Sequence, residues 1–140
     1  MSDSYRRSSI SAAGAQRVIA AGIAKAEEIG VPMVLAVRDE SGILKALVRM
    51  DGSPLMSVEV AQAKAHTAAA TSFDTHGLWD YISNEPQLLA SMPSQPGMAI
   101  FGGGVPLIED GVAIGAVGAS GGSHDEDAAV AEAAAATLAA

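Results

Sequence analysis

Glycine is concentrated in residues 101–124, which read FGGGVPLIEDGVAIGAVGASGGSH. A buried segment with so many glycines must either lie close against neighbouring backbone or turn sharply, because glycine has no side chain to pack. Short apolar runs in this segment, and one that begins just before it at residue 98, predict three strands at about 98–101, 105–109 and 112–119. Strands that follow one another along the chain are typical of an antiparallel sheet.

The remainder of the chain predicts helices and one hairpin. Small and apolar residues recur at helical spacing from Ser11 to Ile29, and Gly30 then ends the helix. Two β-rich runs surround the polar turn Asp39 to Gly42, which is a hairpin pattern. Alanine-rich residues 55–72 and 127–140 predict two further helices.

Residues 73–97 contain three of the six prolines and predict an irregular crossing segment, with short helical turns near residues 78–81 and 87–91. The order of elements is helix, hairpin, helix, crossing, three strands and helix. This order predicts an α+β fold with one antiparallel sheet. With 140 residues and no repeat or linker, we expect a single domain over 1–140, of which 1–9 form a flexible N-terminus.

Composition excludes several classes of partner. The formal net charge is -8 and the eight Lys and Arg are scattered, so we expect no nucleic-acid partner. The absence of cysteine excludes disulfides and thiolate metal sites. No apolar run is long enough for a membrane span or a secretory leader, so we expect a cytoplasmic protein without a membrane partner.

The glycines suggest either a phosphate-binding loop or a nucleophilic serine, and the sequence fits neither. Walker and dinucleotide-binding patterns are absent, and the start of the last helix is acidic, with a capping box between Ser123 and Glu126. The sequence GASGG around Ser120 matches a nucleophile elbow, but the acid and histidine that should follow far downstream are missing. We therefore interpret these glycines as sites of close packing and turning.

Two of the three histidines, His66 and His76, and one arginine are candidates for chemistry. His66, His76 and His124 are not spaced to form a ligand pair on one helix, so no metal site is expected. His66 is either a structural residue of its helix or functional. His76 is either a ligand in the crossing segment or part of a short helix capped by Asp74 or Thr75, with Trp79 covering the core. Arg49 either forms a surface ion pair or clamps an anion against Gly102, Gly103 and Gly104.

Several motifs together carry a resemblance. In chain order they are VRDESG, RMDG, KAHTAA, FGGGVPL and IGAVGASGG, followed by Asp127. This pattern, from about residue 10 onward, strongly resembles the GlcG/HbpS family, which includes the C-terminal domain of PduO-type proteins and is often labelled heme-degrading or heme-binding. The resemblance implies a profilin-like fold, with a five-stranded antiparallel sheet flanked by helices. It also implies a homo-oligomer, from dimer to octamer.

The resemblance also implies site residues. Thr75 corresponds to a family segment, commonly Arg-Pro-Thr, that is implicated in heme contact. Here the segment reads Phe73-Asp74-Thr75, so a negative charge lies where propionates would approach, and the adjacent His76 is a better iron ligand than a hydroxyl. His66 stands where the family often has Tyr.

Three functions follow from these residues. The first is binding of heme or a related tetrapyrrole, with His76 or Thr75 as axial ligand, Arg49 or Lys64 pairing with propionates, and Trp79 in the pocket. The second is a cofactor-independent lyase, hydratase or isomerase acting on a small carboxylated substrate. In that enzyme His66 or His76 moves a proton, and Arg49 with the amides of Gly103 and Gly104 holds the carboxylate. The third is an accessory or sensor module whose surface matters more than its pocket.

Overall fold

The computed structural model describes residues 1–138; the predicted last helix also included residues 139–140, which lie outside the described part. The elements are α1 (Ala12–Ile29), β1 (Val34–Asp39), β2 (Leu44–Arg49), α2 (Ser57–Thr71), α3 (Thr75–Ile82), α4 (Pro86–Ser91), β3 (Gly104–Glu109), β4 (Val112–Ser120) and α5 (His124–Ala135). Short 3-10 turns follow α4 and α5. With one exception, every predicted helix and strand is confirmed within a few residues.

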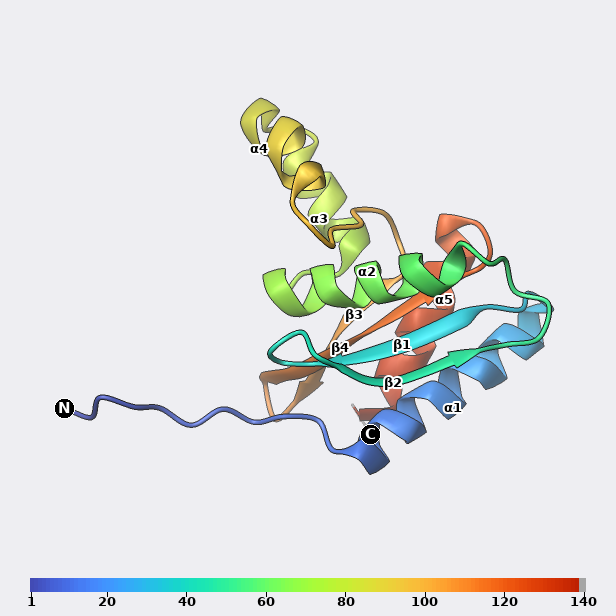
Figure 1. Cartoon of the computed structure of the whole chain (residues 1–140), viewed down its shortest axis with the longest axis horizontal. Coiled ribbons are helices and arrows are strands. Elements are labelled where there is room, and N and C mark those ends of the chain that lie inside the picture. Colours follow the sequence, from blue (N-terminus) through green and yellow to red (C-terminus); the bar gives the residue numbers. More distant parts are fainter. Residues whose placement is uncertain (139–140) are drawn as a thin grey trace.

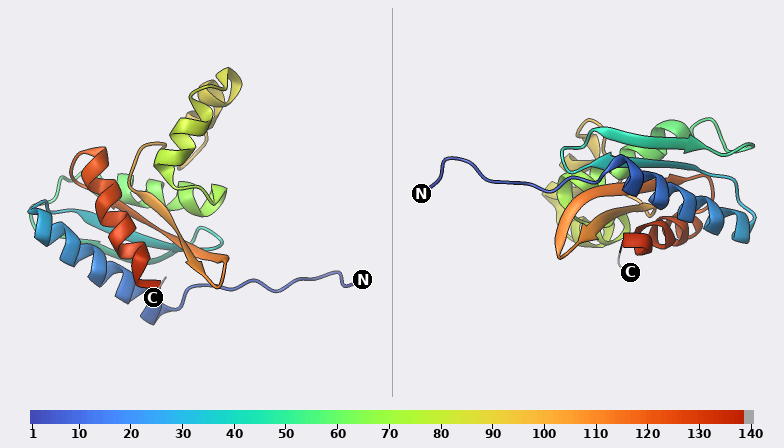
Figure 2. Two further views of the ribbon diagram at one scale, coloured as in Figure 1. Left: turned by 180° about the vertical axis from the view of Figure 1, so that it is seen from behind. Right: turned by 90° about the horizontal axis from the view of Figure 1, so that it is seen from below.

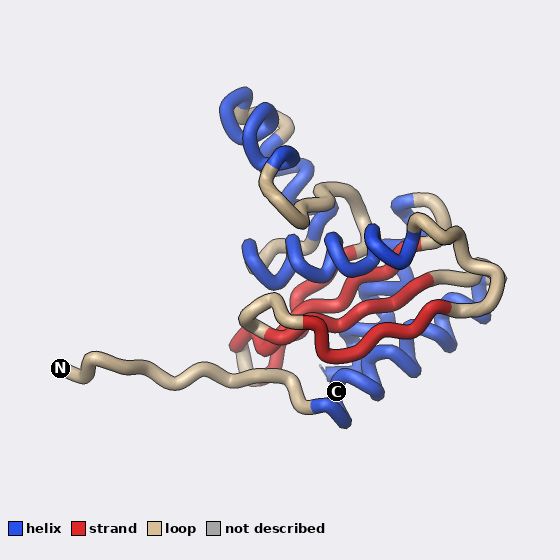
Figure 3. The backbone as a smooth tube through the Cα atoms, in the orientation of Figure 1, coloured by secondary structure: helices blue, strands red, loops and turns tan. Residues whose placement is uncertain are grey.

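The four strands form one antiparallel sheet in the order β2-β1-β4-β3. Helix α2 covers one face, while α1 and α5 lie side by side on the other (Figures 1 and 3). The α+β class is therefore confirmed. The central strand β1 places Val34 and Ala36 toward α2, and Leu35 and Val37 toward α1 and α5.

The predicted five-stranded sheet is wrong in its strand count. Residues 98–101 form no strand, because their backbone groups pair with side chains. The Ala99 amide donates to Thr67 Oγ1 at 2.9 Å, and the Phe101 carbonyl accepts from Thr75 Oγ1 at 2.6 Å. The segment is thus bonded to α2 and α3 instead of extending the sheet. The likeness to profilin stays a prediction.

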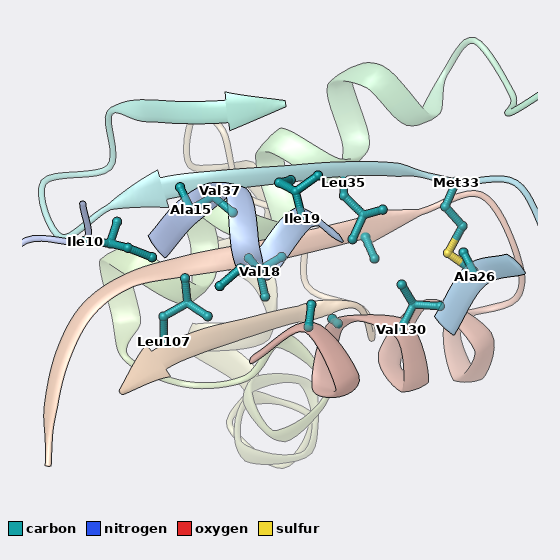
Figure 4. Packing of buried hydrophobic residues seen from close by; sticks show 14 of the residues in the cluster. Ile10, Ala15, Val18, Ile19, Ala26, Met33, Leu35, Val37, Leu107 and Val130 are labelled. Carbon is teal, nitrogen blue, oxygen red and sulfur yellow. The ribbon is translucent and has the colours of Figure 1, made fainter. Parts of the chain in front are cut away.

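Small residues allow the helices to lie close to the sheet. A Cβ added at Gly118 of β4 would lie 2.0 Å from the Ala61 carbonyl oxygen and 2.7 Å from the Ala65 amide nitrogen, both in the backbone of α2. On the opposite face, aliphatic side chains from α1, α5 and the sheet interlock in the main core (Figure 4). This packing explains a core made of Ala, Val, Ile and Leu that holds almost no aromatic ring.

The capping box predicted at the end of the Gly-rich segment is also confirmed. Ser123 Oγ accepts from the Glu126 amide and Glu126 Oε1 accepts from the Ser123 amide, so the capping box is complete. Ser120 is buried, and its hydroxyl lies 3.2 Å from the Ser57 hydroxyl. Its partner is thus a hydroxyl and not an imidazole, which fits a structural serine.

Helices α3 and α4 form an arm that projects from the α2 side of the molecule (Figure 2). Its own small core consists of Leu78, Ile82 and Ile100. The chain before α1 extends away from the body, and its first nine residues are exposed. Within residues 1–138, every helix is too short or too polar to cross a membrane.

Candidate functional site

A cavity of about 370 Å³ lies where the arm meets the body. Its walls come from three segments that are distant in sequence: α3, the loop before β3 and the start of α5. The lining residues are His76, Trp79, Asp80, Ile100, Phe101, Gly102 and His124. The side chains of Trp79 and Phe101 are 45% and 46% exposed, so two large aromatic rings stand side by side at the surface of this cavity. Neighbouring exposed apolar groups of this size are typical of a binding site.

An adjoining depression of about 450 Å³ shares Trp79, Ile100 and Phe101 with this cavity and continues along α2. The two hollows together present a mainly apolar surface with aromatic faces. Such a surface is typical of a site for a flat organic ligand.

Two exposed imidazoles belong to this site. The ring centroids of His76 and His124 are 6.5 Å apart and the ring planes differ by 9°. Each imidazole has a carboxylate partner: His76 Nε2 lies 3.7 Å from Asp80 Oδ2, and His124 Nδ1 lies 3.2 Å from Asp125 Oδ1. Imidazoles paired in this way can coordinate a metal ion that a bound organic molecule carries, or they can transfer a proton.

Both imidazoles stand in the first turn of a capped helix. Asp74 caps α3 by accepting from the Gly77 amide at 2.7 Å, so the predicted capped helix is confirmed. The prediction that Trp79 covers the core is wrong, because Leu78 takes the buried position and Trp79 faces the cavity. The capping box described above begins α5 at His124. The helix caps therefore fix the first turns of α3 and α5, which carry the two imidazoles.

Thr75 is buried and supports the cavity wall from within. Its hydroxyl donates to the Phe101 carbonyl at 2.6 Å and accepts from the Gly104 amide at 2.9 Å. In this arrangement the hydroxyl has no access to a ligand. Thr75 thus ties α3 to the loop that carries Phe101, which contradicts its predicted contact with heme.

Replacing Thr75 by Val is expected to lower the free energy of unfolding by about 1–3 kcal/mol, because the Gly104 amide would lose its buried acceptor. Urea denaturation measures the change. The matched control is Thr71→Val. The Thr71 hydroxyl donates to the Thr67 carbonyl of its own helix and accepts from the Phe73 amide at 3.3 Å, and this second bond is exposed, so water can replace it and the loss should be small. Equal losses in the two variants would contradict the bridging role of Thr75.

Lys64 is also buried and cannot touch a ligand in this structure. Its Nζ donates to Asp127 Oδ2 at 2.7 Å and to the Ala119 carbonyl at 3.1 Å. Burial lowers the pKa of Lys64, although the Asp127 carboxylate opposes this shift. The predicted pairing of Lys64 with propionates is contradicted, because its ammonium is already paired inside the protein.

The predicted role of Gly103 and Gly104 as amide donors is likewise contradicted. Both residues are buried, and the Gly104 amide already donates to Thr75. Gly103 has a φ of +128°, and a Cβ there would lie 2.6 Å from the Ala119 carbonyl oxygen. These glycines let the chain pass over Lys64 and Asp127, and only Gly102 reaches the cavity.

Arg49 and His66 lie outside the cavity. Arg49 ends the edge strand β2, whereas the Gly-rich loop leads into β3 at the opposite edge, about 14 Å away at three strand spacings. The predicted anion clamp is therefore wrong. Half-buried His66 lies beside Gly42 of the hairpin turn and Gly97 of the loop after α4, which favours the structural interpretation.

Sequence reasoning missed Phe101 and His124 as site residues. Phe101 adjoins three glycines, and an aromatic residue beside such a loop is a usable signal. His124 carried no comparable signal, because only the docking of α5 beside α3 brings it to His76. In the described part of the chain, no group of three or more acidic or histidine side chains is placed to hold a metal ion.

Comparison with known proteins places this architecture among characterised folds. The model of the family described as "Haem degrading protein HbpS-like" matches residues 10–136. Protein GlcG of Escherichia coli strain K12 is 38% identical over 106 residues, covering 76% of this chain and 77% of GlcG.

Two solved structures share the fold over nearly their whole length. The Klebsiella pneumoniae protein ORFY is 32% identical with a TM-score of 0.89, covering 100% of this chain and 97% of that one. The PduOC:heme complex is 34% identical with a TM-score of 0.84, covering 93% and 95%.

Proposed function

Because the chain belongs to the HbpS-like family, we propose that it binds heme, or a related tetrapyrrole, in the cavity between α3, α5 and Phe101. The observation that carries this proposal is the pair of exposed imidazoles beside exposed aromatic rings, at the mouth of an apolar hollow. A solved relative that is 34% identical contains heme, which supports the same ligand class here.

The lining residues fit the chemistry of heme. Trp79, Ile100 and Phe101 offer apolar and aromatic surface to the macrocycle, and His76 and His124 offer imidazole nitrogens to iron. Bound heme would supply an iron centre, whereas the protein supplies the ligands and limits access of water. In this proposal His76 takes the role predicted for it, and His124 joins it in place of Thr75.

The charge around the cavity predicts how the propionates lie. Asp74, Asp80 and Asp125 all surround the imidazoles, and neither Arg49 nor Lys64 is available to balance a carboxylate. Like charges repel, so we expect the propionates to remain in solvent. Salt should then strengthen binding modestly by screening this repulsion.

Titration of purified protein with hemin tests the proposal. Wild type is expected to shift the Soret band with a saturable midpoint, and His76→Ala or His124→Ala to weaken binding at least about tenfold through loss of an iron ligand. His66→Ala and Arg49→Ala are matched controls that should bind as wild type, because both residues lie outside the cavity. Absence of a Soret shift in wild type would overturn the proposal.

The enzyme hypothesis loses its predicted arrangement, because His66, Arg49 and the two glycine amides do not converge.

Oligomerisation stays a prediction of the family resemblance, and light scattering with and without hemin measures it.

A further inference from the structure

A buried ion pair lies directly behind the candidate cavity. The side chains of Lys64 and Asp127 are 0% and 3% exposed, and Nζ and Oδ2 are 2.7 Å apart. Removing two charges from water is costly, and a buried pair is often no more stabilising than apolar residues of similar volume. A contribution to stability alone is therefore a weak account of this pair.

The remaining contacts of the pair lead to the cavity walls. Lys64 Nζ lies 4.4 Å from the centroid of the Phe101 ring, within range of a cation–π attraction. Asp127 Oδ1 accepts from the Gly122 amide at 2.8 Å, which fixes the turn immediately before His124. The pair thus touches two separate segments, each of which contributes a lining side chain.

The two walls also meet each other. A Cβ on Gly102 would lie 2.8 Å from the His124 carbonyl oxygen, so the loop after Phe101 rests on the first turn of α5. Thr75 holds the Phe101 backbone from the α3 side, as described above. Lys64 and Asp127 hold the ring and the α5 turn from beneath.

We propose that Lys64 and Asp127 are positioning residues for the cavity: the pair fixes the Phe101 ring and the start of α5, and so sets the separation of the walls that grip a flat ligand. This inference rests on the proposed function for its ligand. Its structural part, the placement of Phe101 and His124, can be measured without ligand.

The test uses the double variant Lys64→Met/Asp127→Leu, which removes both charges and leaves neither unpaired. The single tryptophan of the chain, Trp79, lines the cavity beside Phe101 and reports on the wall. We expect the variant to fold with a melting temperature close to that of wild type and a larger acrylamide quenching constant for Trp79. Its dissociation constant for hemin should rise about tenfold, the scale for residues that orient a ligand.

The matched control is Lys25→Met/Glu28→Leu, which removes an exposed pair on α1 and should change neither quantity. Lys64→Gln/Asp127→Asn provides a second neutral variant that retains hydrogen-bonding groups if the apolar one does not fold. A folded variant with wild-type quenching and wild-type hemin affinity would overturn the inference. If wild type binds no hemin, the proposed function fails, whereas the quenching comparison still decides the positioning role.

Discussion

Replacing Lys64 alone by Met is expected to lower the free energy of unfolding by about 3–5 kcal/mol. The substitution leaves the Asp127 carboxylate, 3% exposed, without its 2.7 Å partner. Among the residues that the structure describes, the isolated buried carboxylate would keep one side-chain hydrogen bond, from the Gly122 amide. Chemical denaturation near neutral pH measures the loss, which is a large fraction of the stability of an ordinary domain.

Two comparisons separate charge from packing. Adding Asp127→Leu to Lys64→Met is expected to restore most of the lost stability, because no unpaired charge then remains buried. Lys25→Met removes the same charge from an exposed pair and is expected to change stability by less than about 1 kcal/mol. Additive losses from Lys64→Met and Asp127→Leu would contradict the interpretation of the two residues as one buried ion pair.

Replacing Gly118 by Ala is expected to cost about 3 kcal/mol or more. The added methyl would lie 2.0 Å from the Ala61 carbonyl oxygen, and backbone on both sides cannot move aside as a flexible side chain can. Helix α2 would have to lift from β4, which opens the packing along the whole helix. Thermal and urea unfolding both measure the effect.

Gly111→Ala is the matched control for this prediction. Gly111 has a φ of +77°, and within residues 1–138 nothing lies within 4 Å of an added Cβ, so the substitution costs backbone strain alone, about 1–2 kcal/mol. A larger loss at Gly111, in the turn before β4, than at Gly118 would contradict the prediction that close packing against α2 makes Gly118 the costlier position.

Local chemistry made much of the fold predictable. Helix α1 begins at the Ser11 cap and ends at Gly30 in the left-handed region, both visible as residue types. Residues 98–101 misled the prediction, because an apolar run looks like a strand unless the hydroxyls of Thr67 and Thr75 are known to take its backbone groups.

The site was less predictable than the fold. His76 and Trp79 were predicted as site residues because a histidine and a tryptophan stand close together in a segment that looked irregular, although the structure places both on a capped helix. Arg49 was misplaced because a hairpin pattern does not say which edge of the sheet each strand will occupy. Lys64 was predicted to pair with propionates, but it is buried against Asp127, which lies far along the chain and could not be matched to it from local sequence.

The sequence by itself determined the helices, the hairpin, the capping of α3 and α5 and the family, because caps, turns and motifs are made by residues near one another in the chain. Only the tertiary structure decided the cavity. His76, Phe101 and His124 meet because α3, the Gly-rich loop and α5 pack together around Thr75, Lys64 and Asp127. Such contacts depend on strand order and on which charges are buried together, and the spacing of nearby residues in the sequence predicts neither.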